Sequence, residues 1–378
     1  MEPDEVVQRR LQAQMLREPG AVTAEAALRK LLAVQSQEFA YARWSLAQRV
    51  PRAAPVTATE IEQAVGEGTI LRTHILRPTW HFVHRDDLRW LLPLSAPRLE
   101  LMNAATNRQT GIDAATAARR ASVLAGAVAG GNHLTRDELA GSLRAAGFPA
   151  KGLQLAYLIM HAEVSGILVS GRPVRSAGGA LKQTYALFDE RVPAGSGTAR
   201  ADALTELVRR YFTSRGPATV KDCAGWSGLT VTDVRQGVQQ ALEAHSGELA
   251  EVVIDGVDHY CASGELPPAA AGPRIDLLQC YDEYVMGYSA TRHYLGGSAP
   301  AFPFGGEPMH VVLLDGRMAG SWRHNLRRDR CELDIRLAGS AADRPAPPLA
   351  AALQAAVDRY ERFIGVPVVA VSSGTKLG

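Results

Sequence analysis

The sequence predicts an α+β protein in which three tandem winged-helix units precede a β-rich C-terminal cap. Two observations predict this fold. Helices followed by strand-like sequence occur three times, and the C-terminal part of the chain is dominated by strand-like sequence. Identity between the three cycles is low, so the repeat is one of architecture. The expected boundaries are residues 1–110, 111–197 and 198–265 for the three units and 266–378 for the cap, which holds a basic hairpin and a terminal helix.

Helices are expected in the first two units where apolar residues recur at helical spacing. Two capping boxes mark helix starts, Thr57 with Glu60 and Thr135 with Glu138. A strand is expected just after Pro78, because proline interrupts helical structure. The second unit would end in strands, whereas two helices would follow the strand of the first unit. The expected helices cover residues 4–16, 24–34, 58–65, 86–92, 97–108, 114–128, 136–147 and 152–165, and the strand covers residues 79–83.

The third unit has the pattern of a helix-turn-helix followed by a hairpin. Gly228 separates two short helices, and the Asp255-Gly256 pair is a strong turn signal between two strands. The cap shows a second such pair at Asp315-Gly316. The helices expected here cover residues 201–215, 219–226, 232–242 and 349–363, and a further hairpin would turn within residues 325–329.

Composition excludes several classes of protein. Hydrophobic residues make up 46% and charged residues 21%, as in an ordinary globular protein. No stretch approaches the ~20 apolar residues of a membrane helix, and the charged N-terminus lacks a signal-peptide core. We therefore expect a cytoplasmic protein that does not associate with membranes. The four cysteines show no C-x-x-C spacing, and we expect no metal and no other cofactor.

The kind of positive charge is more informative than the net charge of +2. Only five of the 41 basic residues are lysines. Arginine suits phosphates and base edges better than lysine does, which favours a nucleic-acid partner. A GC-rich genome would produce the same bias, so this alternative stays open.

A basic hairpin in the cap is the main candidate for DNA contact. An arginine-rich hairpin with an aromatic neighbour suits a minor groove or the phosphate backbone. The alternative is a solvated hairpin tip balanced by Asp329 and Glu332. The wing of the second unit, with Arg172, Arg175 and Lys182, is a further candidate. The predicted DNA-binding residues of the hairpin are Trp322, Arg323, His324, Arg327, Arg328 and Arg330.

The common catalytic signatures are missing. The sequence contains no G-x-S-x-G, no H-E-x-x-H, no P-loop and no dinucleotide-binding glycine pattern. His81 and His84 form an H-x-x-H with His74 nearby, but no acidic or cysteine ligand accompanies them at a suitable spacing. We expect these histidines to pack or to contact backbone rather than to bind a metal.

Two glutamines follow an apolar helix face, as Gln35-Ser36-Gln37. Residues i and i+2 do not share a face of an α-helix, so joint action requires an extended segment, where they point the same way. Alternatively, the glutamines end the helix and hydrogen-bond its free carbonyls. The spacing alone favours the second interpretation.

Four passages resemble the AlkZ-type DNA glycosylases, a family of bacterial proteins that confer resistance to DNA-alkylating and cross-linking antibiotics. They are VQSQEFAYARWSLAQR (34–49), ILRPTWHFVHRDDLRWLL (75–92), CYDEYVMGYSATRHYL (280–295) and HVVLLDGRMAGSWRH (310–324). Their order and spacing run nearly the whole chain. The resemblance implies three tandem winged-helix units that form a C-shaped, concave DNA-binding surface.

The resemblance also implies a catalytic Gln-x-Gln motif, which falls on Gln35 and Gln37. The family's middle residue is usually aliphatic or alanine, and this chain departs from that pattern with Ser36. A related branch has aspartate at the second position, so Gln37 places the chain with the antibiotic-resistance branch. The family's DNA-binding hairpin corresponds to residues 323–330.

A glutamine pair makes chemical sense for a cationic substrate. An N7- or N3-alkylated purine is already charged, so its glycosidic bond is weak without acid catalysis. Gln35 and Gln37 would then only orient the attacking water beneath C1′ and stabilise the oxocarbenium-like sugar. The adjacent Glu38 is expected to be a surface charge.

The sequence thus predicts a monofunctional DNA glycosylase, a hydrolase of N-glycosidic bonds. Its substrate would be double-stranded DNA that carries cationic N7- or N3-alkylated purines, in repair or self-resistance to a DNA-alkylating antibiotic. The unhooking of interstrand crosslinks is left open. The alternatives are a non-catalytic winged-helix regulator and a protein-interaction scaffold. We expect a monomer, because a tandem array supplies internally what a regulator gains by dimerising.

Overall fold

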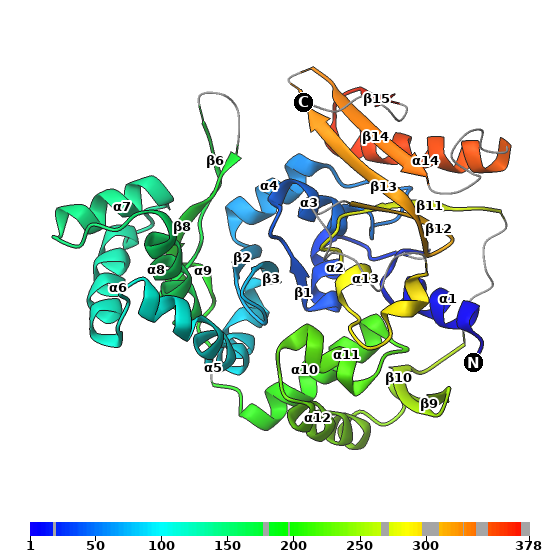
Figure 1. The fold of residues 1–378 in the computed structure, drawn as a ribbon, viewed down its shortest axis with the longest axis horizontal. Coiled ribbons are helices and arrows are strands. Elements are labelled where there is room, and N and C mark those ends of the chain that lie inside the picture. The colour runs from blue at the N-terminus through cyan, green and yellow to red at the C-terminus, as the bar shows by residue number, and fades with distance from the viewer. Residues whose placement is uncertain are drawn as a thin grey trace.

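The computed structural model describes residues 1–17, 20–176, 181–195, 197–265, 272–296, 310–327, 329–337 and 347–371. Helices and strands both contribute to every part of the molecule, so the predicted α+β class is confirmed (Figure 1). No helix within these ranges is long and apolar enough to cross a membrane.

The N-terminal block surrounds a three-stranded antiparallel sheet with the strand order β1-β3-β2. The expected capping box at Thr57 is present, with Glu60 bonding back to the Thr57 backbone. The elements of this block are α1 (Pro3–Ala13), α2 (Ala24–Leu31), β1 (Ala33–Gln35), α3 (Phe39–Ala47), α4 (Ala58–Glu67), β2 (Ile70–His74), β3 (Trp80–His84) and α5 (Arg85–Gln109).

Two expectations for this block were wrong in detail. The helix expected over residues 24–34 ends at Leu31, because Leu32 takes a positive φ of 67° and the chain continues as β1. The two helices expected over residues 86–92 and 97–108 form one helix, α5, with Pro93 and Pro97 inside it. Each proline removes one backbone donor, but packing of the buried leucines of α5 outweighs that loss.

The second block is a helical layer with a small sheet and a projecting hairpin. Its sheet has the order β4-β8-β5, and β6 pairs with β7 in the hairpin (Figure 1). The capping box at Thr135 is present and begins α7, but this helix ends at Ala145, two residues before Gly147, which takes a positive φ of 82°. The elements are α6 (Ala114–Val128), β4 (Leu134–Thr135), α7 (Arg136–Ala145), α8 (Gly152–Val164), β5 (Leu168–Ser170), β6 (Val174–Arg175), β7 (Leu181–Lys182), β8 (Thr184–Leu187) and α9 (Phe188–Arg191).

The third block matches its predicted pattern closely. Thr219 caps the second helix, Gly228 takes a positive φ of 73° after it, and the hairpin turns at Asp255-Gly256 with both residues at positive φ. The elements are α10 (Arg200–Arg215), α11 (Val220–Ser227), α12 (Val231–Ala244), β9 (Leu249–Ile254) and β10 (Val257–Ala262).

The C-terminal part forms a five-stranded sheet in the order β11-β12-β13-β14-β15, covered by α14 (Figure 1). Asp315-Gly316 makes the predicted turn between β12 and β13. The last strand, β15, pairs in parallel with β14 and was not predicted. The elements are β11 (Ile275–Leu278), α13 (Glu283–Met286), η1 (Arg292–Leu295), β12 (His310–Leu314), β13 (Arg317–Leu326), β14 (Cys331–Leu337), α14 (Pro347–Ile364) and β15 (Val368–Val371).

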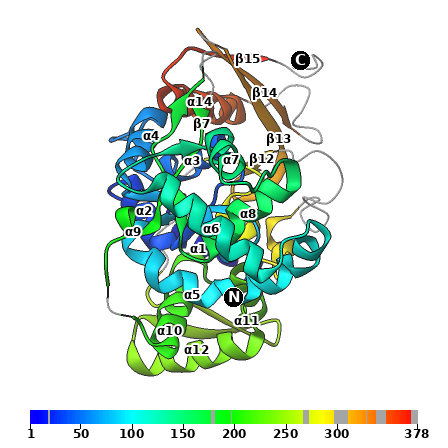
Figure 2. The same cartoon turned by 90° about the vertical axis from the view of Figure 1, so that its left-hand side faces the viewer.

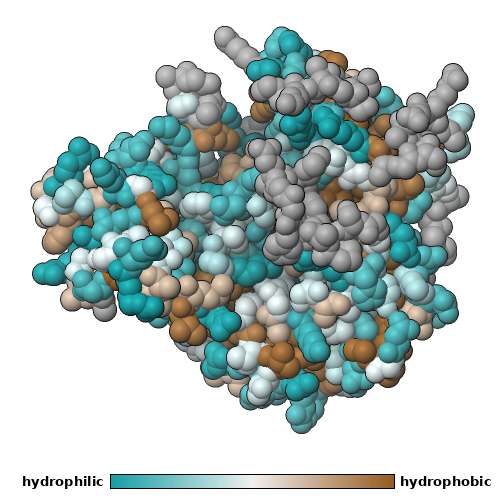
Figure 3. All heavy atoms as spheres, in the orientation of Figure 1, coloured by the Kyte–Doolittle hydropathy of each residue, from teal (hydrophilic) through white to brown (hydrophobic). Residues whose placement is uncertain are grey.

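The blocks differ in how much core they share. One apolar cluster joins the first block to the third, through residues such as Leu91 and Leu207, and another joins the first block to the C-terminal sheet. Most of the second block packs around its own cluster, with Leu124 and Leu158 among its members, while Val169 and Phe188 join the cluster of the first and third blocks. The second block therefore stands out as a lobe beside the rest of the molecule (Figures 1 and 2). Hydrophilic side chains predominate where this lobe meets the first block (Figure 3).

Candidate active site

The segment Gln35-Ser36-Gln37 does not end α2, because it leaves the strand β1 and bends at Gln37. Gln35 is the last residue of β1 and pairs with His81 of β3, and the Ser36 amide donates to the Trp80 carbonyl at 2.7 Å. The two glutamine side chains differ in environment, since Gln35 is 3% exposed and Gln37 is exposed. The two glutamines therefore do not point the same way as they would in a straight strand, since one amide lies in the interior and the other at the surface.

Arg77 determines the orientation of the Gln35 amide. Its Nη2 donates to Gln35 Oε1 at 2.9 Å and to His81 Nε2 at 3.1 Å. His81 Nδ1 donates to the Thr79 carbonyl at 2.9 Å, so Nε2 carries the lone pair. Burial, and then the Arg77 charge, hold the pKa of His81 well below its usual value, so the ring stays neutral. Because arginine has only donors, the carbonyl of Gln35 must face Arg77 and the amino group must face away from it.

A buried carboxylate holds the backbone of Gln35. Glu283, which begins α13, accepts the Gln35 amide proton at 2.9 Å through Oε1. Its Oε2 accepts from Arg215 Nη2 at 2.7 Å and from Trp226 Nε1 at 2.6 Å. Burial acts to raise the pKa of Glu283, but the charges of Arg215 and Arg77 outweigh it, and the pKa lies below its usual value. Glu283 therefore stays ionised and ties β1 to the third block.

Arg72 of β2 holds the two residues that follow. Its Nε donates to the Ser36 carbonyl at 3.0 Å and its Nη2 to the Gln37 carbonyl at 3.2 Å. The guanidinium lies over the Trp80 ring, 4.4 Å from its centroid. Burial lowers the pKa of Arg72 to about 10, which still leaves it charged at neutral pH. The glutamine segment is thus anchored from both sides before any ligand binds.

Gln37 lines a cleft of about 440 Å³ between the first block and the second. Its Oε1 accepts a weak hydrogen bond from the Trp80 amide at 3.4 Å. The far wall comes from the start of α7, from α8 and from the strands β7 and β8. Gln35 does not line this cleft. The two glutamines are therefore close in the chain, but their side chains do not lie in one cavity.

The three histidines of the H-x-x-H region do not converge on a common point. His74 bonds to the buried Glu163, His81 bonds to Arg77, and His84 accepts from the Asp86 amide at the start of α5. Nowhere in the described ranges do three histidine, cysteine or acidic side chains gather as metal ligands would.

Glu38 is partly buried rather than a plain surface charge. Its side chain is 34% exposed, and its Oε2 lies 3.6 Å from His310 Nε2 of β12. Burial raises the pKa of the Glu38 carboxyl. The expectation of a solvated charge therefore needs correction, although Glu38 does not line the cleft with Gln37.

The hairpin of β13 and β14 presents only part of its predicted DNA-binding set. Trp322 is 1% exposed and donates its Nε1 proton to the Leu278 carbonyl at 2.8 Å, so its inclusion in a DNA contact was wrong. Arg327 and Arg330 are about half exposed near the tip, where both lie close to Glu332. Arg323 is 39% exposed and lies 3.4 Å from Asp334. Arg328 lies outside the described residues.

His324 is held inside an aromatic cluster and does not act as a surface cation. Its ring stacks on Tyr41 with centroids 4.1 Å apart, and its Nδ1 contacts the Tyr360 hydroxyl. Burial, helped by the Arg43 charge, lowers the pKa of His324 to about 4. The ring is neutral at pH 7, which corrects its expected role as a positive DNA contact.

This histidine predicts acid sensitivity. The folded pKa of about 4 lies below the unfolded value of about 6.5, so the unfolded chain binds the proton more readily. The stabilisation is complete above pH 6.5 and is lost as the pH falls towards 4. Both proteins should become less stable when the pH falls from 7 to 4.5. We expect the loss of unfolding free energy to be about 1–2 kcal/mol smaller in His324→Gln than in the wild type. Urea unfolding at both pH values measures this, and parallel losses in the two proteins would contradict it.

Sequence reasoning missed the residues that hold the glutamines. Arg72, Arg77, Gln279 and Glu283 contact Gln35 or its neighbours, and each lies at least 35 residues away in the chain. Arg77 and Glu283 do fall inside the passages that carry the family resemblance. That resemblance was the available signal, because contacts across so many residues leave no local pattern.

Comparisons with known proteins agree with the family resemblance found in the sequence. A family model described as DNA glycosylase AlkZ-like matches residues 28–363. The fold is similar to a solved structure, the Streptomyces sahachiroi DNA glycosylase AlkZ, with a TM-score of 0.73, 22% identity and coverage of 98% of this chain and 100% of that one. The search of curated proteins found no match. Because the family model covers most of the chain, the protein belongs to the AlkZ-like DNA glycosylase family.

Proposed function

We propose that this protein is a monofunctional DNA glycosylase that excises cationic N7- or N3-alkylated purines from double-stranded DNA. The observation that carries the proposal is the anchored glutamine segment. In a chain of this family, Gln35 and Gln37 are held by Arg77, Arg72 and Glu283 beside a cleft between two blocks. Preorganised dipoles of this kind stabilise developing charge without reorganisation during the reaction.

The proposed reaction needs no acid. Water attacks C1′, the glycosidic bond breaks and its electron pair neutralises the purine cation, and the proton of the attacking water is released to the solvent. Each glutamine carbonyl accepts one hydrogen bond from the protein, Gln35 from Arg77 and Gln37 from the Trp80 amide, and keeps a second lone pair. Such a lone pair can orient the water and face the positive charge that develops on the sugar.

The architecture supports DNA as the partner. Residues 1–110, 111–197 and 198–265 each combine helices with a small sheet or hairpin, and we propose that they are winged-helix units in a C-shaped array. Residues 266–378 would form the cap. The hairpins β6–β7 and β13–β14 extend from the same side of the molecule (Figure 1). We propose that a monomer grips the duplex there and that its open cleft also admits crosslinked purines, as self-resistance to an alkylating antibiotic requires.

Arg327→Ala combined with Arg330→Ala is expected to weaken DNA binding. Both side chains are about half exposed near the hairpin tip. Each lost phosphate contact should reduce the slope of log K against log salt by about 1, so the double variant should lower it by about 2. Fluorescence anisotropy over a salt series measures the slope. Arg200→Ala, an exposed change on α10, is the control, and equal slopes in all three proteins would remove the hairpin from the interface.

Arg77→Ala is expected to slow base release about 100-fold with little change in DNA affinity. The variant frees the Gln35 amide to rotate, and misplacement of a catalytic group by about 1 Å costs about that factor. Arg77→Lys keeps one donor and should recover part of the rate. Single-turnover kinetics separate the rate from binding. Equal rates in Arg77→Ala and the wild type would show that Gln35 needs no such support.

The direct test incubates the wild-type protein with a duplex that carries a single N7-alkylguanine. A glycosylase releases free base and leaves an abasic site that breaks under alkali, and it does so in any sequence context. A regulator would bind one operator and release no base, which would overturn the proposal. A crosslinked duplex in the same assay tests unhooking.

A further inference from the structure

A glutamine without a partner lies in the wall of the cleft that Gln37 lines. Gln183 stands between β7 and β8, and neither its side-chain oxygen nor its nitrogen has a hydrogen-bond partner among the described residues, although both atoms are buried. Trp80, on the wall from the first block, has a buried indole N–H in the same condition. Buried polar atoms are normally hydrogen-bonded. Both residues line the same cleft, so a polar ligand there would satisfy these atoms once the side chains turn towards it.

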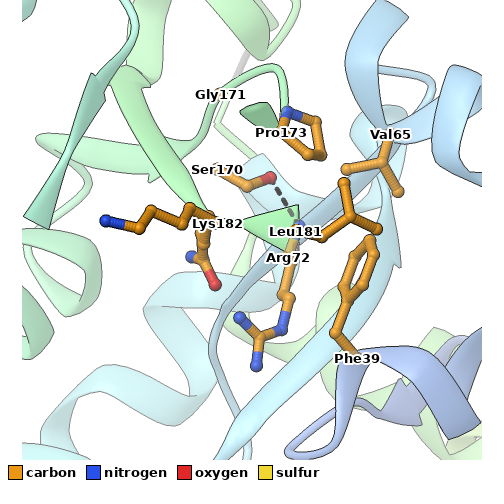
Figure 4. Close-up of a pocket in the computed structure, with 9 residues that line it drawn as sticks. Phe39, Val65, Arg72, Ser170, Gly171, Pro173, Leu181 and Lys182 are labelled. Carbon is orange, nitrogen blue, oxygen red and sulfur yellow. Dashed lines mark hydrogen bonds between the residues drawn. The ribbon is translucent and has the colours of Figure 1, made fainter. Parts of the chain in front are cut away.

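The cleft has the size and position of a binding site. Its volume of about 440 Å³ falls in the usual range for small-molecule sites of about 300–1,000 Å³. Gln183 also borders a smaller cavity of about 110 Å³, which Phe39, Leu181 and Arg72 help to line (Figure 4). The segment between β7 and β8 is thus a thin wall between two hollows, and Ser170 fixes the strand opposite by accepting the Arg72 amide proton at 2.8 Å (Figure 4).

We propose that this cleft receives the extruded purine and that Gln183 hydrogen-bonds to its Watson–Crick edge. The inference rests on the proposed glycosylase function. A primary amide presents one acceptor and two donors side by side. That pattern matches the O6 and N1–H of guanine and equally the N1 and N6–H of adenine. Alkylation blocks N7 of guanine but leaves this edge free, and flipped bases are read there.

The charges around the cleft agree with a bound nucleotide. Arg136 and Lys182 line it and would lie near the phosphates of the extruded nucleotide. Lys182 is 51% exposed and lies 3.5 Å from Asp137, a pair open enough for exchange with a phosphate. Because Gln37 lines the same cleft, a base that reaches Gln183 brings its sugar towards the proposed catalytic segment.

Gln183→Glu tests whether residue 183 hydrogen-bonds to the Watson–Crick edge of the purine. A carboxylate accepts the N1–H and N2–H of guanine but has no proton for N1 of adenine. In randomly methylated DNA, we expect the variant to raise the ratio of released N7-methylguanine to N3-methyladenine about 10-fold, as one lost hydrogen-bonded pair would. Gln183→Met should slow release of both bases while keeping the thermal midpoint, because its polar atoms have no protein partner. Gln240→Glu on α12 is the control for an added charge.

A binding measurement separates this inference from the proposed function. The probe is a duplex with a 2′-fluorinated N7-methylguanosine, which resists cleavage. We expect Gln183→Met to weaken its binding about 10-fold and to leave the affinity for an unmodified duplex unchanged. If the wild type releases no base, the glycosylase proposal fails and this affinity alone decides the inference. An unchanged release ratio together with unchanged affinity for the probe would overturn the role of Gln183, whatever the catalytic rate.

Discussion

Alanine at both Gln35 and Gln37 is expected to reduce base release from N7-alkylguanine DNA by at least about 10³-fold. Removal of one preorganised dipole at a reacting centre typically costs about 10²–10³ in rate. The two amides are held separately, Gln35 by Arg77 and Gln37 by the Trp80 amide, so neither can replace the other. Base release measured in a single turnover gives the rate.

The matched control is Gln239→Ala, a change of the same type on an exposed face of α12. DNA affinity of the double variant should stay close to that of the wild type, because only Gln37 is exposed. The single variants are informative as well, since Gln37 lines the cleft and Gln35 does not. Excision by the double variant at the wild-type rate would sink the glutamine mechanism while leaving the family assignment intact.

Glu283→Ala is expected to have the largest effect on stability, a loss of about 3–5 kcal/mol of unfolding free energy. Glu283 and Arg215 are fully buried ion-pair partners, and removal of the carboxylate leaves an uncompensated cation in the interior. The variant also removes the acceptors of the Gln35 amide and the Trp226 indole. Urea unfolding at pH 7 measures the change.

The control for this variant is Asp189→Ala, which removes a carboxylate that is 73% exposed from its ion pair with Arg89. Exposed pairs contribute at most about 1 kcal/mol, so the control should change little. Glu283→Gln keeps an acceptor for the Gln35 amide, and it should unfold less easily than Glu283→Ala. Equal unfolding free energies for Glu283→Ala and the control would show that the buried pair does not stabilise the fold.

The expected and observed elements show which signals are local. The capping boxes at Thr57 and Thr135 and the turn at Asp255-Gly256 appear where the sequence places them. Such signals work because the interacting groups are a few residues apart and need no partner elsewhere in the chain.

The strands of the first block and of the C-terminal part could not all be predicted from local sequence, because they form by pairing with segments far away in the chain. β1 is three residues long and β2 carries no alternation, because all five of its residues are buried. Their strand character comes from pairing with β3, on either side of it. Likewise, α5 continues through two prolines because its leucines enter a shared core. Tertiary packing outweighed local propensity in each case.

The sequence by itself determined the α+β class, the helix starts, the tight turns, the family resemblance and the glutamines Gln35 and Gln37. Only the tertiary structure decided how those glutamines are held and which basic residues face solvent. Arg77 lies 42 residues from Gln35 in the chain and Glu283 lies 248 residues from it. Likewise, Trp322 and His324 are buried in the protein and do not form the DNA contacts that were predicted for them. Both outcomes depend on contacts between distant segments, and no pattern within a segment records them.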